Sequence, residues 1–513
     1  MKNTFFITTP IYYVNDAPHI GHAYTSVACD VLARFMRLSG KEVMFLTGTD
    51  EHGQKVEKSA AAKGIAPGDF VDSVSQHFRT LAQHMNISNN DFIRTTEGRH
   101  IKGAQALWQK MQAGGSIYLG SYAGWYAVRD EAFYTESELI DGKAPTGAEV
   151  EWVEEPSYFF RLSDYSEKLL AFHEANPDFI MPQSRRNEVI SFVKGGLKDL
   201  SISRTTFKWG IPVPGDEKHI MYVWLDALAN YLTAIGYPEG DYNHFWPADI
   251  HMVGKDILRF HAVYWPAFLM AADLPLPRRV FAHGWWTIEG EKMSKSLGNV
   301  VAPAELLEQY GLDQTRYFLM REVPFGNDGN FSRERMAIVI NSELANNVGN
   351  LVQRTLSMIH KNCGGIVPDA QGVEKDELDL AFLQKAQVTE AATQGEMEKR
   401  YYDCKFNEIL ADIMQIASEA NSYIDTKAPW KQKKTDERLM NATLYHLVEA
   451  IRCIAIMLQP FIPDSAAKIL RLLGYSEEAL KAGIGFNQLK PESAIKAGTA
   501  ILSPEPLFPR IEG

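Results

Sequence analysis

The first fifty residues constrain the fold of this chain more than any other stretch. Thr4 to Tyr13 is an apolar run that predicts a buried strand, and Asn15-Asp16-Ala17-Pro18 follows it with capping side chains and a proline suited to a first helical turn. His22 to Leu38 has apolar residues at helical spacing, and Glu42 to Leu46 predicts a second strand. This order of elements predicts the opening of a doubly wound parallel sheet, in which ligands bind at the carboxyl ends of the strands.

A first signature, His19-Ile20-Gly21-His22, lies between the first strand and the helix. Its two histidines are spaced i, i+3 and share one helical face. The helix N-terminus adds N–H groups and a positive dipole end, which suit phosphate, and Gly21 lets a nucleotide approach the backbone closely. Taken alone, the string is equally compatible with two surface histidines beside a turn.

A second signature, Lys292-Met293-Ser294-Lys295-Ser296, lies in a glycine-flanked loop after the expected strand Arg279 to His283. Lys292 and Lys295 would hold β- and γ-phosphates as charge shifts to a leaving pyrophosphate. A solvated basic loop is the commoner explanation for two such lysines alone. Because the sequence has no Walker-type lysine loop, a P-loop enzyme is disfavoured.

Polar residues also follow other expected strands. Asp50 lies in Thr47 to Gly53, read as a loop, where its carboxylate would hold an ammonium group or a ribose hydroxyl; a turn-forming aspartate is the alternative. The strand pattern returns at Tyr222 to Leu225, before Asp226, and at Ile250 to Val253, before Gly254-Lys255-Asp256-Ile257.

Aromatic residues near these strands suit an apolar, polarizable substrate tail. His261 and Trp265 are spaced i, i+4, although an aromatic pair at that spacing is more often core than pocket. Sulfur packs well against rings such as Tyr13, Trp224 and Trp265, so a thioether is one candidate.

The rest of the chain predicts two further kinds of structure. Tyr118 to Phe133 and Glu149 to Arg161 predict short aromatic strands in a small inserted module, and helical periodicity dominates from about Asn341 to Leu473. A length of 513 residues fits several domains. The expected boundaries are 1–115 and 201–325 for two halves of the α/β domain, 116–200 for the insertion, and 326–513 for the helical bundle and tail.

Composition and charge limit the cellular compartment and the kinds of partner that we expect for this chain. We expect no signal peptide and no membrane span, because no basic region leads into an apolar one and no apolar run reaches about 18 residues. Four scattered cysteines suggest neither disulfides nor zinc, which favours a reducing cytoplasm. A net charge of −12 argues against indiscriminate nucleic-acid binding but is compatible with a structured RNA that meets a local basic stripe.

The two signatures, in this order and in a chain of this size, resemble those of class I aminoacyl-tRNA synthetases, and the chain as a whole resembles the methionyl-tRNA synthetases. The family form of the second signature is matched in every letter, and Pro18 precedes the first. The resemblance implies a Rossmann-type catalytic sheet, a connective-peptide insertion and a C-terminal anticodon-binding bundle.

The resemblance also implies site residues. Methionine-binding residues would be Ile11, Tyr13, Asp50, Trp224, Ala227, Leu228, Tyr231, Ile257, His261 and Trp265, with Asp50 on the ammonium group and Tyr231 and His261 near the sulfur. ATP-binding residues would be His19, Gly21, His22, Gly254, Asp256, Lys292 and Lys295, of which both histidines and both lysines would be catalytic. Asn350, Arg354 and Trp430 would read the anticodon.

The implied reaction has two steps. Methionine attacks the α-phosphorus of ATP, with Mg²⁺ bridging the phosphates, to give methionyl adenylate; a 3′-terminal ribose hydroxyl of tRNA(Met), initiator or elongator, then attacks the activated carbonyl. Three alternatives remain. A small nucleotidyltransferase would not need the helical bundle, a synthetase for leucine, isoleucine or valine would carry a larger insertion, and a catalytically silent tRNA-binding relative would keep the fold alone.

Two departures from some family members shape further expectations. Those members bind zinc through cysteine pairs in the insertion, whereas Tyr118 to Arg161 contains no cysteine, so we expect no structural zinc. Others extend into a dimerising C-terminal domain, whereas this sequence stops at Gly513, so we expect a monomer.

Metal analysis checks the first of these expectations. Purified protein should contain no stoichiometric zinc, and a strong chelator should leave it folded, because zinc sites in small modules need clustered cysteine or histidine ligands. About one tightly held zinc per chain, which a chelator removes with loss of structure, would contradict the expectation.

Overall fold

The computed structural model describes residues 3–14, 17–130, 132–288, 290–292, 299–387 and 393–512. The chain forms two compact units. The first comprises Met1–Cys29 and Val43–Gly284, and the second comprises Asp30–Glu42 and Trp285–Gly513. Helix α1 (Ile20–Leu38) therefore contributes its first half to one unit and its second half to the other.

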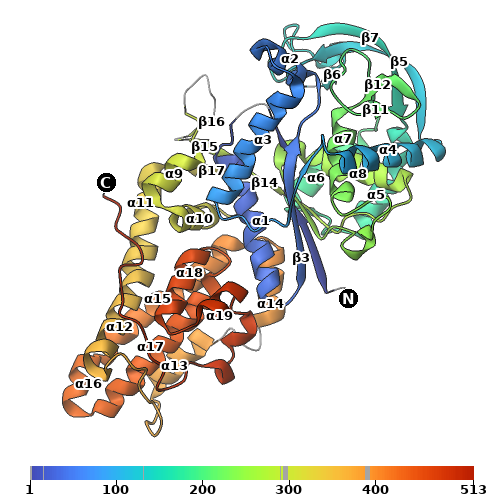
Figure 1. The fold of residues 1–513 in the computed structure, drawn as a ribbon. Helices are drawn as coiled ribbons and strands as arrows, with labels where there is room; N and C mark the ends of the chain where they lie inside the picture. Colours follow the sequence, from blue (N-terminus) through green and yellow to red (C-terminus); the bar gives the residue numbers. More distant parts are fainter. Residues whose placement is uncertain are drawn as a thin grey trace. The chain divides into compact units, whose positions relative to one another are not determined.

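A seven-stranded sheet forms the centre of the first unit (Figure 1). Its order is β2-β3-β1-β13-β14-β8, β4 also pairs with β3, and the registered pairs are all parallel. The doubly wound parallel sheet predicted from the first fifty residues is thus confirmed. The strands are β1 (Thr4–Thr8), β2 (Tyr12–Tyr13), β3 (Glu42–Asp50), β4 (Asp91–Arg94), β8 (Ile180–Met181), β13 (Ile250–Gly254) and β14 (Val280–His283).

Three local predictions were wrong. The first strand is interrupted after Thr8, because Pro10 has no N–H group to donate to a sheet. Strand β3 continues to Asp50, so this carboxylate ends a strand and does not lie in a loop. The apolar stretch from Tyr222 is not a strand but the start of helix α7, since short apolar runs do not distinguish the two by periodicity.

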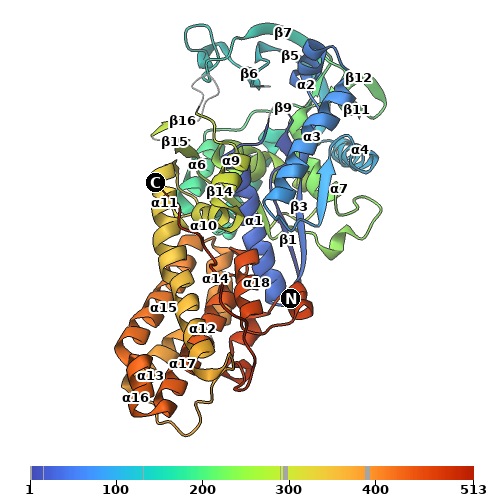
Figure 2. The same ribbon diagram turned by 60° about the vertical axis from the view of Figure 1, so that its left-hand side comes forward.

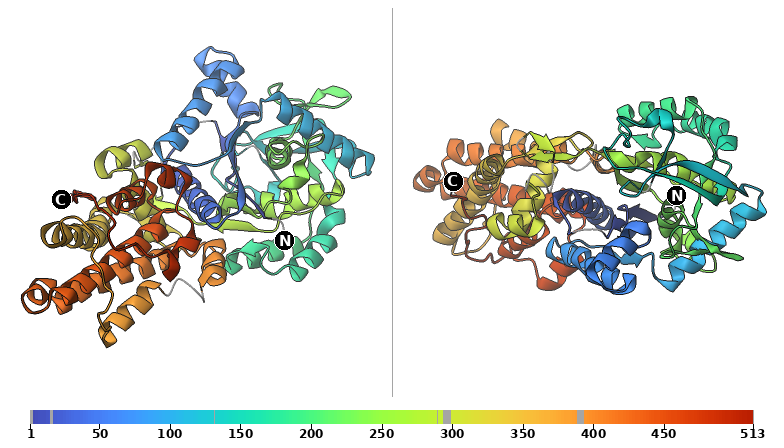
Figure 3. Two further views of the ribbon diagram at one scale, coloured as in Figure 1. Left: turned by 60° about the horizontal axis from the view of Figure 1, so that its bottom comes forward. Right: turned by 90° about the horizontal axis from the view of Figure 1, so that it is seen from above.

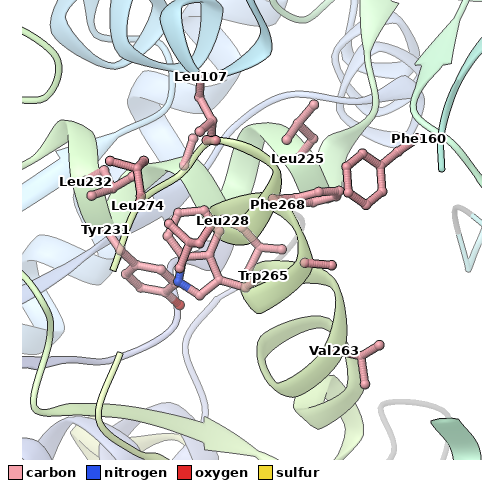
Figure 4. Close-up of a cluster of buried hydrophobic side chains, with 14 of the residues drawn as sticks. Leu107, Phe160, Leu225, Leu228, Tyr231, Leu232, Val263, Trp265, Phe268 and Leu274 are labelled. Atoms are coloured by element: carbon pink, nitrogen blue, oxygen red, sulfur yellow. The ribbon is translucent and has the colours of Figure 1, made fainter. Parts of the chain in front are cut away.

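Most helices of the first unit bury their apolar faces in one large core, whereas the two helices that follow β3 pack in a second, smaller cluster. Figure 4 shows part of it, where Leu107, Phe160, Trp265 and Phe268 come together from helices and a strand that are far apart in sequence. The helices are α2 (Gln54–Lys63), α3 (Pro67–His84), α4 (Gly98–Ala113), α5 (Ser166–Ala175), α6 (Gln183–Lys194), α7 (Val223–Thr233) and α8 (Trp265–Ala271).

The expected inserted module is present as a four-stranded antiparallel sheet. Its order is β6-β5-β7-β9, and the long strands β5 and β7 curve together at the top of Figure 1. The strands are β5 (Ile117–Ala127), β6 (Ala132–Tyr134), β7 (Glu151–Phe160) and β9 (Leu200–Ser201). A separate three-stranded sheet follows, formed by β10 (Ser203–Arg204), β11 (Pro212–Val213) and β12 (Asp216–Met221).

The second unit is mostly helical, as predicted from residue 341 onward. It begins with a three-stranded sheet of β15 (Trp286–Ile288), β16 (Glu291–Lys292) and β17 (Gly329–Phe331). The helices are α9 (Pro303–Tyr310), α10 (Leu312–Arg321), α11 (Arg333–Val339), α12 (Asn350–Cys363), α13 (Glu377–Gln387), α14 (Thr393–Tyr402), α15 (Phe406–Lys427), α16 (Pro429–Thr435), α17 (Glu437–Leu458), α18 (Pro463–Leu472) and α19 (Glu477–Ala482).

Two features of this unit stand out in the views. A π-helical segment, Ile340–Gly349, joins α11 to α12, so that the three form one column in Figure 2. The long helices α15 and α17, orange to red in Figure 3, pack against each other in the bundle.

Helix α17 is long and apolar enough to cross a membrane, but 83% of its most apolar window is buried within the structure, as in a core helix.

One fully buried ion pair ties three segments of the second unit together. Arg316, on α10, donates to Asp30 at 2.7 Å, and neither side chain is exposed. The same guanidinium donates to the carbonyl oxygens of Phe461 and Pro460, at the corner between α17 and α18. Arg34 is a second partner of Asp30 at 2.7 Å. The arginine thus satisfies backbone groups that helix ends leave open.

Removing this guanidinium should destabilise the protein strongly. We expect Arg316→Ala to lower the free energy of unfolding by about 3 kcal/mol, the low end for breaking a buried pair, because Arg34 still faces the carboxylate. Lys385→Ala, which removes the exposed partner of Glu419, is the control and should cost less than about 1 kcal/mol. Equal losses in denaturant unfolding of the two variants would contradict this account.

Candidate active site

Polar side chains gather at the carboxyl edge of the parallel sheet. Asp50, Gly254 and His283 are the last residues of β3, β13 and β14, and Gly254 is registered opposite His283. The chain leaving β1 passes through β2, whose Tyr13 is registered opposite Asp50. Helix α1 begins immediately after His19. Because parallel strands end at a common edge, residues far apart in sequence are brought to the same edge of the sheet in this unit.

The first signature is folded onto itself by two hydrogen bonds. The backbone N–H of Gly21 donates to Nδ1 of His19, and the backbone N–H of His19 donates to Nδ1 of His22, both at 3.1 Å. The two imidazole rings lie 4.0 Å apart between centroids. A Cβ at position 21 would lie 2.9 Å from the His19 ring, so any larger residue there would have to displace this ring.

These bonds define the tautomers of both rings. Burial lowers the pKa of His19, and the charge of Asp256 offsets this only in part. Burial, with a smaller contribution from His19, lowers the pKa of His22 well below its usual value. Both rings are therefore neutral at pH 7, and since Nδ1 accepts in each, Nε2 carries the proton. The signature presents two Nε2–H donors.

Gly254 and Asp256 lie beside these histidines. A Cβ at Gly254 would come within 2.8 Å of an Asp256 carboxylate oxygen, so glycine keeps this corner open. The Asp256 side chain is exposed, and its charge acts on His19 and on His283. Nδ1 of His283 donates to the Gly284 carbonyl oxygen, and its Nε2 meets the Thr25 hydroxyl at 2.8 Å.

A second group of predicted residues surrounds Tyr231. Its hydroxyl donates to Nε2 of His261 at 2.7 Å, because Nδ1 of His261 donates to the Ile257 carbonyl oxygen at 3.0 Å. Burial lowers the pKa of His261 to about 4, in agreement with a neutral ring that accepts this bond. Figure 4 shows Tyr231 and Trp265 side by side, with ring centroids 6.1 Å apart.

Trp265 is fully buried and held by a histidine that the sequence did not single out. Its indole N–H donates to Nε2 of His251 at 3.3 Å, so Nδ1 of His251 donates to the Thr8 hydroxyl at 2.9 Å. The Tyr231 ring lies 4.1 Å from the His251 ring. The pairing of β1 with β13 places Thr8 opposite His251, which explains why this contact bridges 243 residues.

The remaining predicted pocket residues lie in or against the same core. Trp224 is partly buried and stacks on Phe260 at 3.6 Å between centroids, a partner that sequence analysis missed. Residues 260–264 form a π-helical turn, so the expected helical spacing of His261 and Trp265 does not put them on one ideal α-helical face. Ile11, Tyr13 and Ile257 are partly buried against the core, and Ala227 and Leu228 are buried within the unit.

The second signature is only partly described. Backbone Lys292 ends β16, whereas Lys295 and the rest of 293–298 lie outside the described residues. The turn before it is held by Asn330, whose side-chain oxygen accepts from the Gly290 N–H at 2.7 Å and from the Thr287 hydroxyl at 3.1 Å. Gly290 has a φ of +87°, which explains a glycine at this turn. Sequence analysis had no signal for Asn330.

The three residues expected to read an anticodon lie in the second unit. Asn350 and Arg354 are one turn apart on α12 and contact Asn421 and Asp425, one turn apart on α15. Trp430 on α16 is 46% exposed and therefore does not pack in the bundle core. Of the neighbouring lysines, Lys427 is held by Asp376 and Asp379, while Lys431 and Lys434 are exposed.

Sequence analysis also missed a buried cluster behind α7. Asp226 accepts hydrogen bonds from His52 and His100, both at 2.7 Å. Asp226 and His52 each follow an apolar run in the sequence, but nothing in their spacing predicts that they pair. Within the described ranges, no three histidine, cysteine, aspartate or glutamate side chains are grouped to hold a metal ion.

Comparison with known proteins gives matches along the whole chain. The family model of class I tRNA synthetases (M) matches residues 5–151 and 137–356, and that of the anticodon binding domain of methionyl tRNA ligase matches residues 367–513. A methionine–tRNA ligase of Rickettsia felis is 60% identical over 100% of this chain and 99% of its own length. One from Brucella suis is 54% identical over 99% of this chain and 98% of its own.

Solved structures agree with these relatives. The Mycobacterium tuberculosis methionyl-tRNA synthetase in complex with methionyl-adenylate matches with a TM-score of 0.94 and 48% identity, covering 99% of this chain and 100% of that one. The apo form of that synthetase matches with a TM-score of 0.87 and 45% identity over 100% of this chain and 99% of that one.

The neutral state of His261 makes stability depend on pH. Its pKa is about 4 in the folded protein and near 6.5 in an unfolded chain, so only the unfolded chain takes up the proton between these values. This stabilisation is complete above pH 6.5 and is lost as the pH falls. At pH 5 the loss should be about 2 kcal/mol.

We therefore expect His261→Gln, which does not titrate, to lose about 2 kcal/mol less than the parent protein between pH 7 and pH 5. Denaturant unfolding at the two pH values measures this difference. Other buried histidines titrate in both proteins, so the test compares the loss of unfolding free energy in the variant with the loss in the parent protein. Identical pH dependences would contradict the neutral, accepting ring.

Proposed function

We propose that both reaction steps of this chain, which belongs to the class I tRNA synthetases of the methionyl type, take place at the carboxyl edge of its parallel sheet. The chain is a ligase that activates methionine with ATP and forms methionyl-tRNA. In the first step the methionine carboxylate attacks the α-phosphorus of ATP and expels pyrophosphate. In the second a terminal ribose hydroxyl of tRNA attacks the adenylate carbonyl and expels AMP. Neither step needs a covalent enzyme intermediate.

His19 and His22 are proposed as donors to the ATP phosphates. Each presents an Nε2–H group, held by the backbone bond to Nδ1, beside the N-terminus of α1. Because the rings are already oriented, they stabilise charge that develops on the phosphates without rearranging during the reaction. Gly21 keeps the backbone accessible, and Gly254 and Asp256 are proposed to receive the adenosine.

Lys292 and Lys295 are proposed to neutralise the leaving pyrophosphate from the signature loop. ATP is proposed to bind as its Mg²⁺ complex. When bound, the cation supplies charge neutralisation at the phosphates. We propose no structural zinc for this chain.

Asp50 is proposed to bind the methionine ammonium group, which puts the reacting carboxylate toward the ATP site. The thioether would lie against Tyr231, His261 and Trp265. Because the Tyr231 proton is donated to His261, the phenolic oxygen and the aromatic faces are what this network offers to sulfur. The other proposed contacts to methionine are Ile11, Tyr13, Trp224, Ala227, Leu228 and Ile257.

The second unit is proposed to read the anticodon of initiator and elongator tRNA(Met) through Asn350, Arg354 and Trp430. The exposed indole offers a stacking face to an unstacked base. We further propose a cytoplasmic monomer, with the domain boundaries 1–115, 116–200, 201–325 and 326–513 given above.

The observations that support the proposed site are Asp50 at the end of β3, the His19–His22 pair at the start of α1 and the Tyr231–His261 hydrogen bond, in a chain of this family. ATP–pyrophosphate exchange with each of the twenty amino acids tests it. We expect exchange with methionine alone, followed by charging of tRNA(Met). No exchange with any amino acid would instead indicate a catalytically silent tRNA-binding relative.

Variants of His22 test both its proposed tautomer and its proposed hydrogen bond to the ATP phosphates. His22→Gln keeps an amide donor near the Nε2 position, whereas His22→Asn and His22→Ala do not. We expect adenylate formation to fall about 10²- to 10³-fold in His22→Ala and His22→Asn and distinctly less in His22→Gln, with methionine affinity nearly unchanged in all three. Stopped-flow adenylation measures this. Rates within about threefold of the parent protein in His22→Ala would refute the phosphate role.

Trp430→Ala separates tRNA recognition from chemistry. Loss of a stacking face worth roughly 1–3 kcal/mol should lower kcat/KM for tRNA aminoacylation by a factor of about ten or more. Exchange without tRNA and the melting temperature should barely change, because the side chain is exposed. Lys427→Ala is a contrasting variant that should mainly reduce stability, since Lys427 is paired with Asp376 and Asp379. Equal loss of both activities in Trp430→Ala would contradict the assignment.

A further inference from the structure

The cluster of Asp226, His52 and His100 is fully enclosed in the first unit and has no part in the chemistry proposed above. Asp226 has no exposed surface and His100 none either. Nδ1 of His52 donates to one Asp226 oxygen and Nε2 of His100 donates to the other, both at 2.7 Å. Burial alone would raise the pKa of Asp226, but the two histidines outweigh it and lower the pKa to about 2. The carboxylate is therefore ionised.

The three residues come from three segments, and two of these segments, the end of β3 and α7, carry or adjoin proposed methionine-binding residues. His52 follows Asp50 by two residues, just after β3 ends. His100 lies in the first turn of α4, and Asp226 in the first turn of α7. Nδ1 of His100 also meets the Thr233 hydroxyl, at the other end of α7, at 2.9 Å. The cluster thus holds α7 at both ends.

Asp226 occupies the back of α7. The proposed pocket residues of this helix, Trp224, Ala227, Leu228 and Tyr231, are spaced to share one face. Asp226, Asn230 and Thr233 are spaced to share the opposite face. A hydrogen bond from His52 to Asp226 therefore links the segment that follows the ammonium-binding carboxylate to the rear of the helix whose front carries the pocket.

Close packing makes this link stiff. At Gly103 on α4, a Cβ would lie 2.3 Å from the Thr233 side chain, so only glycine lets α4 approach α7 this closely. On its other side the segment after β3 is held by Trp209, whose indole donates to the Glu51 carbonyl oxygen at 2.7 Å and whose own carbonyl accepts from the Gly53 N–H at 3.1 Å. His52 is fixed between these two supports.

We propose that Asp226, with His52 and His100, is a positioning cluster that sets the distance between the Asp50 carboxylate and the thioether pocket on α7, and so selects methionine by the separation of its ammonium group from its sulfur. This deepens the proposed function and rests on Asp50 as the ammonium site. The cluster does not touch substrate; it acts through the placement of Asp50.

The test uses the full chain and two competitive probes that share the thioether. Methioninol keeps the ammonium group, whereas 4-(methylthio)butanoate lacks it. His52→Ala breaks the link, and His52→Asn restores a donor, because its amide nitrogen lies near the Nδ1 position. Tyr165→Phe, which removes a buried hydrogen bond to Ser116 elsewhere in the unit, is the matched control. Asp226→Ala is included, but it leaves two buried histidines without their partner, so the His52 pair decides.

In His52→Ala we expect the KM for methionine and the inhibition constant of methioninol to rise about tenfold or more, with kcat in exchange and binding of 4-(methylthio)butanoate changed less than about threefold. His52→Asn should recover most of the loss, and Tyr165→Phe should match the parent protein. Equal weakening of both probes would show a merely structural role and overturn the proposal, as would no change in either.

Asp50→Asn in the same assay distinguishes failure of the positioning cluster from failure of the ammonium site. If Asp50→Asn weakens methioninol selectively and His52→Ala does not, the positioning cluster is wrong and the ammonium site stands. If Asp50→Asn leaves the ratio of the two inhibition constants unchanged, the ammonium site itself is wrong, and the positioning proposal fails with it.

Discussion

Parallel hydrogen bonding between β1, β13 and β14 is the constraint on which the rest of the first unit depends. The register sets Thr8 opposite His251, across most of the unit's sequence, and Gly254 opposite His283 on the next strand. Because the strands run in one direction, their carboxyl ends and the loops that follow them share one edge. A chain with the same residues in a shifted register would move each of them to the other face of the sheet.

Burial then assigns each titratable group its state. His22, His251 and His261 lose their charge because their surroundings do not solvate it, and as neutral rings they donate from one nitrogen and accept at the other. Asp226 keeps its charge because two donors compensate the burial. In the proposed site, oriented neutral donors would meet phosphate and the Asp50 carboxylate would meet an ammonium group, without rearrangement of water around either.

Much of the architecture could be predicted because it depends on periodicity over many residues. The strands before Gly254 and at Val280 to His283, the aromatic antiparallel module and the helical bundle all follow from such patterns. Features that depend on only a few residues were harder to predict from the sequence. The apolar residues after Tyr222 fit a strand as well as the helix they form, and the π-helical turn at His261 is a packing result that residue spacing does not reveal.

Contacts between distant segments could not be predicted at all. Nothing in the sequence pairs His52 with Asp226 or His251 with Trp265, because each pair forms only after the sheet and its helices have assembled. The predicted pocket residues came from family resemblance, while the groups that hold them in place came from the structure. This division is physically reasonable, since a substrate constrains residue identity directly, whereas a supporting contact can be met by many combinations of side chains.

A crystal structure of this chain with a non-hydrolysable analogue of methionyl adenylate would show whether the carboxyl edge of the parallel sheet is the active site. We expect the analogue at the carboxyl edge, with its ammonium group within hydrogen-bonding distance of Asp50, its thioether against Tyr231 and Trp265, and its phosphate-mimicking group facing Nε2 of His19 or His22. An ammonium group that does not contact Asp50, or an analogue bound away from this edge, would contradict it.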